Sequence, residues 1–183
     1  LEYDSAGRLA GIQVAPGGER ITYGYHETTG QLKKVEGPDD VAQSFTYHGG
    51  LLASNAYSGP VDGNLTRSYD QDFRLTQLEV RGAPFPISFQ YDNDSLLTGV
   101  GYDQTNGMLT LVRGCESGLI TATNFGSAQK VADRRGYNGF GELTSYTADC
   151  NGSACLAIQY LRDDLGRITQ KVETVAGSTK IYR

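Results

Sequence analysis

The sequence predicts an all-β protein made of tandem antiparallel hairpins, and three observations lead to this prediction. A short phrase beginning with tyrosine and aspartate recurs along the chain, at a spacing of 22 residues over its first half. Each copy is flanked by stretches in which aromatic or β-branched residues alternate with polar ones, the pattern of half-buried strands. The 183 residues include 24 Gly and 12 Tyr but no Trp, a composition typical of a turn-rich β protein rather than a helical one.

The recurring phrase is clearest at the start of the chain, where Tyr3, Asp4, Gly7 and Arg8 are followed by leucine. A period in the low twenties that is held along a chain is typical of repeat architectures. Later copies keep some or all of these positions: Tyr25 with Gly30, Tyr47, Tyr69 with Asp70 and Arg74, Tyr91 with Asp92, Tyr137 with Gly141, and Tyr160, followed after a longer spacer by Gly166 and Arg167. The phrase is missing near residue 114, so residues 97–136 are interpreted as an irregular repeat that continues the same meander.

Each copy is interpreted as one hairpin. A strand ends at the tyrosine, the aspartate opens the turn by accepting a backbone N–H two residues later, and a glycine supplies the positive φ that hairpins use. A second strand follows the turn. In chain order, the expected strands include 9–12, 21–25, 32–35, 75–80, 87–91, 97–102, 108–112, 119–123, 143–146 and 156–160. Further turns are expected at 17–18, 37–38, 59–60, 82–84 and 103–107, and no helix is expected.

The consensus of a tyrosine, a spacer, Tyr-Asp, two residues and Gly-Arg-Leu resembles the Rhs/YD-repeat family, which has related repeats in Tc-toxin shell components and teneurins. Residues 1–9 and 163–169 match this consensus best, and residues 137–143 are similar to a common bacterial variant. The resemblance covers nearly the whole chain as one region, 1–183, and its specificity rests on repetition at a fixed period. The sequence departs from the family at His26 and His48, which replace the aspartate.

The resemblance implies that the hairpins form a twisted, curved sheet that is part of a hollow β-shell. In this family such shells enclose a C-terminal polypeptide, often a toxin, or form the body of adhesion proteins. The expected function is therefore that of a structural wall segment, not of an enzyme, in a secreted or cell-surface bacterial protein. The expected partners are the remainder of the shell and its enclosed C-terminal domain. The alternative is a carbohydrate- or cell-surface-binding module that uses exposed tyrosines, although repeated tyrosines also fit a structural ladder across strands.

Cys150 and Cys155 form the candidate disulfide. They flank a loop between the strand-like stretches 143–146 and 156–160, so their thiols are expected to face each other. A disulfide is the favoured interpretation if the protein is exported. Cys115 is left over, and because no histidine lies near these cysteines in the sequence, a metal site is not expected.

The remaining polar residues predict neither a cofactor nor catalysis. The net charge of −5 and the scattered basic residues argue against a nucleic-acid partner, and no apolar run is long enough to cross a membrane. His26, His48 and acidic pairs such as 163–164 occupy turn positions that favour such residues for conformational reasons. The Asp-Pro type of self-cleavage motif found in many Rhs proteins is absent, so the resemblance does not carry that activity to this chain.

Both ends of the chain fall at the same phase of the repeat. Leu1 lies two residues before a Tyr-Asp, and Arg183 is followed by the place where the pattern calls for another. We therefore expect a segment of a longer array. A strip taken from such an array has unpaired strand edges, so the isolated chain is expected to self-associate.

Overall fold

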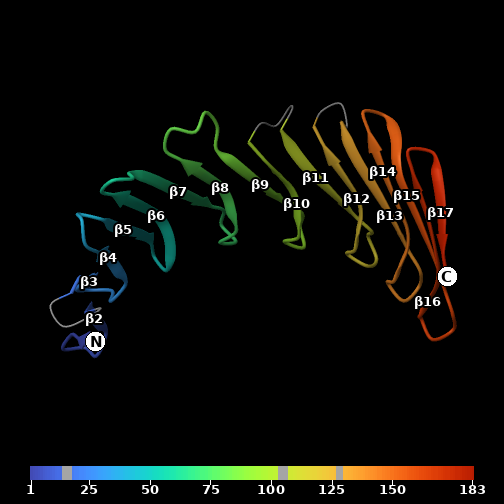
Figure 1. The fold of residues 1–183 in the computed structure, drawn as a ribbon. Helices are drawn as coiled ribbons and strands as arrows, with labels where there is room; N and C mark the ends of the chain where they lie inside the picture. The colour runs from blue at the N-terminus through green and yellow to red at the C-terminus, as the bar shows by residue number, and fades with distance from the viewer. Residues whose placement is uncertain (14–17, 103–106, 127–129) are drawn as a thin grey trace. The chain divides into compact units, whose positions relative to one another are not determined.

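Seventeen strands and no helix make up the part of the chain that the structure describes (Figure 1). This computed structural model describes residues 1–13, 18–102, 107–126 and 130–183. The strands are β1 (Glu2–Tyr3), β2 (Leu9–Gln13), β3 (Arg20–Tyr25), β4 (Leu32–Glu36), β5 (Ala42–His48), β6 (Leu51–Ser58), β7 (Gly63–Tyr69), β8 (Leu75–Val80), β9 (Ile87–Tyr91), β10 (Leu97–Gly101), β11 (Met108–Arg113), β12 (Ile120–Phe125), β13 (Val131–Tyr137), β14 (Leu143–Cys150), β15 (Ser153–Arg162), β16 (Ile168–Val175) and β17 (Ser178–Tyr182).

The strands are distributed over two compact units, residues 1–86 with β1–β8 and residues 87–183 with β9–β17. Within each unit, every strand pairs antiparallel with the next strand along the chain. Each unit is therefore a meander of hairpins, as Figure 1 shows. This arrangement confirms the predicted all-β fold of tandem antiparallel hairpins.

The strand boundaries follow the sequence pattern closely. β1, β3, β7 and β9 end at the predicted tyrosines, whereas β5 continues one residue beyond Tyr47 to His48. β15 continues two residues beyond Tyr160, so Arg162 is the residue that precedes the last repeat turn. The turns predicted at 17–18 and 103–107 lie largely outside the described residues.

The hairpin that the sequence lacks near residue 114 is present in the backbone. β11 and β12 are joined by a turn in which the Gly114 N–H donates to the Leu119 carbonyl and the Gly118 N–H donates to the Gly114 carbonyl, both at 2.9 Å. Two equivalent bonds close the turn at 26–31. The His26 N–H donates to the Gln31 carbonyl at 2.8 Å, and the Gly30 N–H donates to the His26 carbonyl at 2.9 Å. The repeat is hidden in the sequence because arginine stands where tyrosine is expected and glycine stands where aspartate is expected.

In unit 1 the register separates an apolar face from a polar one. Residues directly opposite each other on neighbouring strands project from the same face. The pairs on one face are mainly apolar: Tyr23–Val35, Phe45–Asn55, Asn55–Leu65 and Leu65–Val80. The pairs on the other face are mainly polar: Thr22–Glu36, Lys34–Ser44, Thr46–Ser54 and Thr66–Glu79.

The described residues form a single layer of strands with little buried core. The described residues that are buried are all small: Gly11, Ala53, Asn55, Gly99, Gly107 and Ala132. The accessible surface is 12298 Å², whereas a compact globular protein of this mass exposes about 8,600 Å². Many apolar side chains therefore remain half-exposed and have room for a partner. No helix in the described part of the chain is available to span a membrane.

Candidate functional site

The residues that define the repeat gather at the turns that close the hairpins. We call these the repeat turns: residues 4–8, 26–31, 48–51, 70–74, 92–96, 114–119, 138–142 and 163–167. Because neighbouring strands are antiparallel, the repeat turns within a unit all lie at the same end of its strands. The other connections lie at the opposite end (Figure 1).

In five of the repeat turns, which we call the standard turns, the first residue organises the backbone of the turn. In the turn at 4–8, Asp4 Oδ1 accepts the N–H groups of Ala6 and Arg8, both at 2.9 Å. The Asp4 N–H donates to the Arg8 carbonyl at 2.8 Å, and the Gly7 N–H donates to the Asp4 carbonyl at 3.0 Å. Equivalent side-chain and backbone bonds occur in four more turns, opened by Asp70, Asp92, Asn138 and Asp163. A short side chain with a carbonyl-type oxygen is therefore what this position requires.

The fourth residue of the standard turn lies in the left-handed region. Gly7, Gly141 and Gly166 have φ values of 77°, 78° and 78°. Phe73 and Ser95 occupy the same position in their turns, with φ values of 63° and 64°. Side chains with a Cβ atom are strained in this region, so these two turns keep the backbone shape at a conformational cost.

The arginine that ends several turns neutralises the turn carboxylate. Arg8, Arg74 and Arg167 each place Nε 2.7 Å from Oδ2 of the aspartate that opens the turn. The backbone N–H of Arg8 is the main cause of the lowered pKa of Asp4, and the Arg8 side chain adds to it. At Asp70, partial burial opposes the change, but hydrogen bonds from Arg74 prevail and lower the pKa. The Arg167 side chain is the main cause of the lowered pKa of Asp163.

The residue before each repeat turn lies beside a bulge. At Tyr25, for example, the register shifts between Gly24, opposite Lys34, and Tyr25, opposite Leu32. The same kind of shift occurs beside every described repeat turn. An extra residue on one strand bends the ladder and redirects the neighbouring side chain. In three hairpins the extra residue is a threonine whose hydroxyl donates to a carbonyl across the bulge: Thr76 to Ser68, Thr121 to Val112 and Thr169 to Leu161.

The redirected tyrosines tie each hairpin to the one before it. The Tyr25 hydroxyl donates to the Leu9 carbonyl at 2.8 Å, directly after the preceding repeat turn. Three more bonds repeat this connection at 2.9 Å: Tyr47 to Leu32, Tyr69 to Leu52 and Tyr137 to Ile120. These side chains are half-buried and use their polar end within the sheet, which is the arrangement of a structural ladder.

Two arginines take over the position of the tyrosine. Arg113 Nη2 donates to the Leu97 carbonyl at 3.3 Å and Arg162 Nη2 donates to the Leu143 carbonyl at 3.4 Å, matching the tyrosine bonds. A second nitrogen of each side chain donates to a carbonyl of its own turn, Gly118 or Gly166. In the last repeat the bulge and the carbonyl contact both belong to Arg162, which lies two residues after Tyr160. Sequence reasoning missed this because it searched for tyrosine at that position.

The last residue of one turn also contacts the next turn. The Arg8 guanidinium lies over the Tyr25 ring, 4.4 Å from its centroid, and Gln31 Nε2 donates to the Gly49 carbonyl at 2.7 Å. Glu142 has the position of Arg8 in its turn, and its Oε2 lies 3.7 Å from Nε of Arg162. A cation over an aromatic ring in one pair of turns is thus replaced by an ion pair in another.

Glu142 also approaches a glycine of the next turn. A Cβ atom at Gly166 would lie 2.7 Å from Glu142 Oε1, at the end of a flexible side chain that can move aside. The requirement for glycine at this position is therefore its positive φ of 78°.

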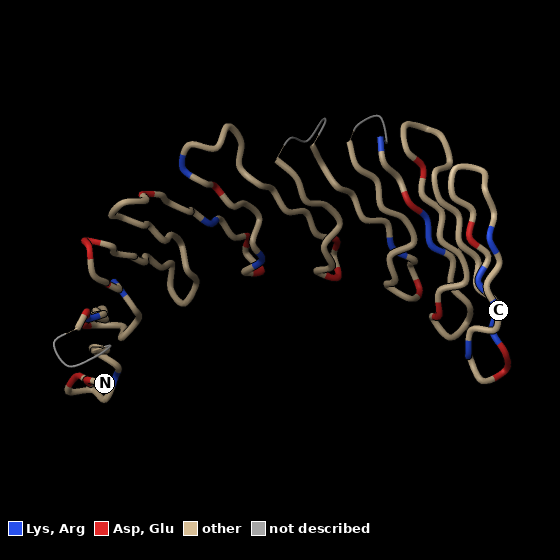
Figure 2. Tube along the Cα trace, in the orientation of Figure 1, with Lys and Arg blue, Asp and Glu red and all other residues tan. Residues whose placement is uncertain are grey.

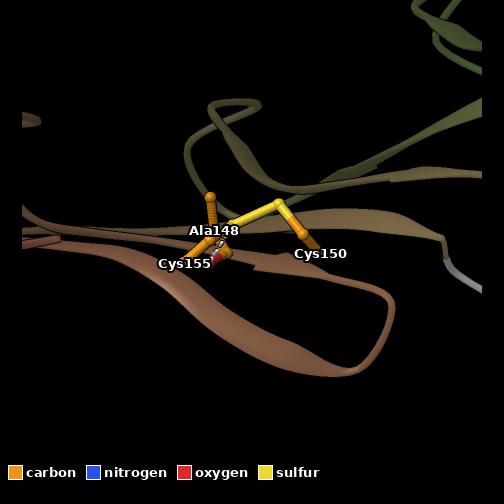
Figure 3. Close-up of a disulfide and its surroundings, with 3 residues drawn as sticks. All are labelled: Ala148, Cys150 and Cys155. Atoms are coloured by element: carbon orange, nitrogen blue, oxygen red, sulfur yellow. Dashed lines mark hydrogen bonds between the residues drawn. A yellow bond between two sulfur atoms is a disulfide. The ribbon is translucent and has the colours of Figure 1, made fainter. Parts of the chain in front are cut away.

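Cys150 and Cys155 are joined by a disulfide with Cα atoms 6.0 Å apart (Figure 3). The loop between their strands is shorter than predicted, because β14 extends to Cys150 and β15 begins at Ser153. Asn151 and Gly152 make the connection with φ values of 51° and 78°, as in a type I′ turn. A register shift makes Cys155 the extra residue, and its Sγ lies 3.3 Å from the Ala148 carbonyl oxygen. Cys115 is exposed and unpaired.

The described residues offer little for catalysis or metal binding. They contain no cluster of three or more His, Cys, Asp or Glu side chains that is placed to hold a metal ion. His26 instead meets the Tyr47 ring edge-on at a centroid distance of 6.3 Å. The turn carboxylates of Asp4, Asp70 and Asp163 are engaged by backbone N–H groups and arginines.

Comparison with known proteins gave one family and several similar folds. The model of the Teneurin YD-shell family matches residues 1–182. The crystal structure of TcdB2-TccC3 is similar with a TM-score of 0.73 and 12% identity, over 98% of this chain and 12% of that one. A Tc holotoxin pore from Photorhabdus luminescens is similar with a TM-score of 0.56 and 15% identity, over 99% of this chain and 12% of that one. No curated protein matched the sequence.

At these identities the solved structures show the fold alone, and the chain spans about one eighth of the length of each. The family match has a wider basis, because it includes all the repeat turns and nearly every residue. It agrees with the Rhs/YD-repeat resemblance and with the hairpin ladder, and both support a structural role. The chain thus belongs to the Teneurin YD-shell family.

Proposed function

We propose that this chain is a wall segment of an Rhs-type encapsulating shell, and that the full-length protein houses a C-terminal polypeptide or toxin. The observation that carries the proposal is the interlocking of the repeat turns. Tyrosine or arginine from one hairpin bonds to the carbonyl that follows the preceding turn, in both units. Each hairpin thereby fixes its neighbour, as in repeat proteins whose stability comes from nearest-neighbour contacts.

A structural role also agrees with the hydrogen bonds that the carboxylates and tyrosine hydroxyls of the repeats make within the sheet. An active site needs groups that are free to bind substrate or to transfer a proton. Here the carboxylates of Asp4, Asp70 and Asp163 already have partners within the sheet. So do the hydroxyls of four repeat tyrosines, Tyr25, Tyr47, Tyr69 and Tyr137. These bonds weigh against the carbohydrate-binding alternative for these four tyrosines, because their hydroxyls are engaged.

The partners that follow from this role are the remainder of the shell and its enclosed domain. β17 pairs with β16 and has no second neighbour among the described residues, and all five of its residues are exposed. An unpaired edge of this kind is a template for another strand. The next strand of the shell would pair there, and another copy of the chain would take that place when the shell is absent.

The disulfide bears on the location of the protein. Disulfides persist in oxidising surroundings and are rare in the cytosol. The Cys150–Cys155 bond lies at the exposed end of the β14–β15 hairpin and agrees with a secreted or cell-surface protein. Membership of the Teneurin YD-shell family also supports a secreted or cell-surface location.

Electron cryo-microscopy of the natural protein that contains this chain tests the proposal. We expect residues 1–183 to lie in the wall of a closed shell, with one face of the sheet toward a lumen that holds polypeptide density. A sheet with both faces open to solvent would contradict the wall function. A closed shell with an empty lumen would retain the wall and refute the enclosed polypeptide.

A further inference from the structure

An apolar groove in unit 1 is not used by the repeat turns. It has a volume of about 660 Å³ and lies near the connections β4–β5 and β6–β7. Its floor includes Val35, Gln43 and Tyr57, which lie directly opposite one another on β4, β5 and β6. Its sides include Val41 and Val61. Ligand sites in proteins have volumes of about 300–1,000 Å³, so this groove is large enough to be one.

Close backbone packing fixes the sides of the groove. A Cβ atom at Gly59 would lie 3.1 Å from both the Asp40 carbonyl oxygen and the Val41 Cα atom. The absence of a side chain at Gly59 therefore allows the two connections to touch. Pro38 and Pro60 lie in the same connections and restrict their backbones further. The groove is thus formed before any ligand arrives.

The exposed side chains of the groove are the ones that an apolar ligand would cover. Val61 is 79% exposed, Val41 is 47% exposed and Tyr57 is 42% exposed. Removing such surface from water is favourable in proportion to its area. Since all three side chains border one hollow, a single ligand would cover them together.

The groove has an acidic border. Asp39 lines it and Asp40 is adjacent, and both side chains are exposed. Within the described part of the chain, no ion pair or hydrogen bond engages either carboxylate. Both residues are in the left-handed region with φ values of 57°, so the connection holds two neighbouring carboxylates in a strained backbone. Figure 2 shows this acidic segment in red at the end of β4. A ligand that fits must combine apolar groups with positive charge.

We propose that this groove binds an extended peptide segment whose apolar side chains are flanked by lysine or arginine. The apolar side chains would cover Val41, Tyr57 and Val61, and the flanking cations would pair with Asp39 and Asp40. The site concerns unit 1 alone, and it stands or falls independently of the wall function.

A labelled peptide of alternating leucine and valine, flanked on both sides by paired lysines, is the probe. Its binding to the chain is measured by fluorescence anisotropy. We expect saturable binding that V41S/V61S weakens by at least about tenfold, because two exposed valines lose their apolar contact. The matched control is V112S, which removes a valine of the same exposure, 47%, from β11 in unit 2. It should leave binding unchanged.

The charge contribution is tested separately. D39N/D40N removes both carboxylates, and asparagine tolerates a positive φ. We expect binding several-fold weaker and less sensitive to salt, while D94N, in the exposed turn 92–96, changes neither. The same peptide with glutamates in place of lysines should bind more weakly than the lysine peptide.

Three results would overturn the proposal. The first is the absence of saturable binding, and the second is binding that V41S/V61S leaves intact. The third is self-association of the chain that V41S/V61S abolishes, because the occupant of the groove would then be a second copy.

Discussion

At the scale of single residues, the aspartate that opens a repeat turn acts through geometry and charge together. Asp70 Oδ1 accepts the N–H groups of Asp72 and Arg74, while Oδ2 meets Nε of Arg74. Asn138 makes the same two backbone bonds without a charge. The backbone bonds therefore define the turn, and the ion pair with arginine is an addition that depends on pH.

The ion pairs between the turn aspartates and their arginines predict that the protein loses stability in acid. The pKa values of Asp4, Asp70 and Asp163 lie below the ordinary value of 3.8 when the protein is folded. A lowered folded pKa stabilises the protein above the unfolded pKa, and this contribution is lost as the pH falls through the folded pKa. We expect D4N/D70N/D163N to reduce the fall in urea midpoint between about pH 6 and about pH 2. An unchanged fall would show that the three carboxylates do not contribute to acid sensitivity.

The two strained turns predict a gain in stability. F73G replaces a side chain at φ 63° with glycine, which adopts this backbone without strain, and S95G does the same at φ 64°. Each should raise the free energy of unfolding by about 1 kcal/mol, measured by thermal melting. The control is F140G, because Phe140 is in an equivalent turn but does not have a positive φ. A gain at F140G as large as at F73G would contradict this explanation.

At the scale of hairpins, the last residue of one repeat turn contacts the residue that precedes the next turn, and the chemistry of this contact differs between repeats. Arg8 and Tyr25 form a cation–π contact, and Glu142 and Arg162 form an ion pair at equivalent positions. Each pair is attractive as it stands, and we expect a mixture of the two to lose this attraction. E142R alone would place two guanidinium groups together. R162Y alone would remove the cation beside Glu142 and leave its carboxylate with the Asn138 hydrogen bond.

A double-mutant cycle tests this coupling. We expect E142R and R162Y each to lower the free energy of unfolding, and the double variant to recover about 1 kcal/mol relative to the sum of the two. Chemical denaturation of the four proteins provides the measurement. Strictly additive effects would mean that neighbouring repeat turns are independent.

The disulfide gives a second prediction at this scale. C150S/C155S should lower the free energy of unfolding by about 2 kcal/mol, the value for a short closed loop. The Asn151–Gly152 turn already favours the hairpin, so the fold should persist. Mass measurement after blocking free thiols, with and without reductant, reports the state of the bond. Three free thiols in material prepared without reductant would contradict it.

The sequence was sufficient to predict the hairpins, because alternation and turn residues are local signals. Strands β8 and β9 have the predicted limits, and β1, β3, β7, β9 and β13 end at the tyrosine of their repeat. The sequence was insufficient where a different residue meets the same geometric need. Arg113 and Arg162 reach the carbonyl that tyrosine reaches elsewhere, and Phe73 and Ser95 adopt the φ of glycine. Such replacements are visible only when the neighbouring strand is in place.

The groove of unit 1 was not predicted for a related reason. Val35, Gln43 and Tyr57 are far apart in the chain and become neighbours through the register of β4, β5 and β6. The contact at Gly59 depends on a turn from another hairpin. Sequence patterns within one strand contain neither relation.

At the scale of the whole molecule, the central feature is that each unit is a single layer of strands with little buried core among its described residues. The described residues bury few side chains completely, and β17 presents an unpaired edge with exposed Ile181. In a closed shell the neighbouring strand would occupy this edge, and in isolation another copy of the chain is available instead.

Light scattering of the isolated chain at rising concentration tests whether the unpaired edge of β17 recruits a second copy. We expect species larger than the 19.8 kDa monomer that grow with concentration. I181K should restore the monomer, because a lysine on an edge strand opposes pairing. I168K, a change of similar exposure on the paired strand β16, should not, and V41S/V61S should not either. A monodisperse monomer of 19.8 kDa at every concentration would show that the chain does not need a neighbour at its edge.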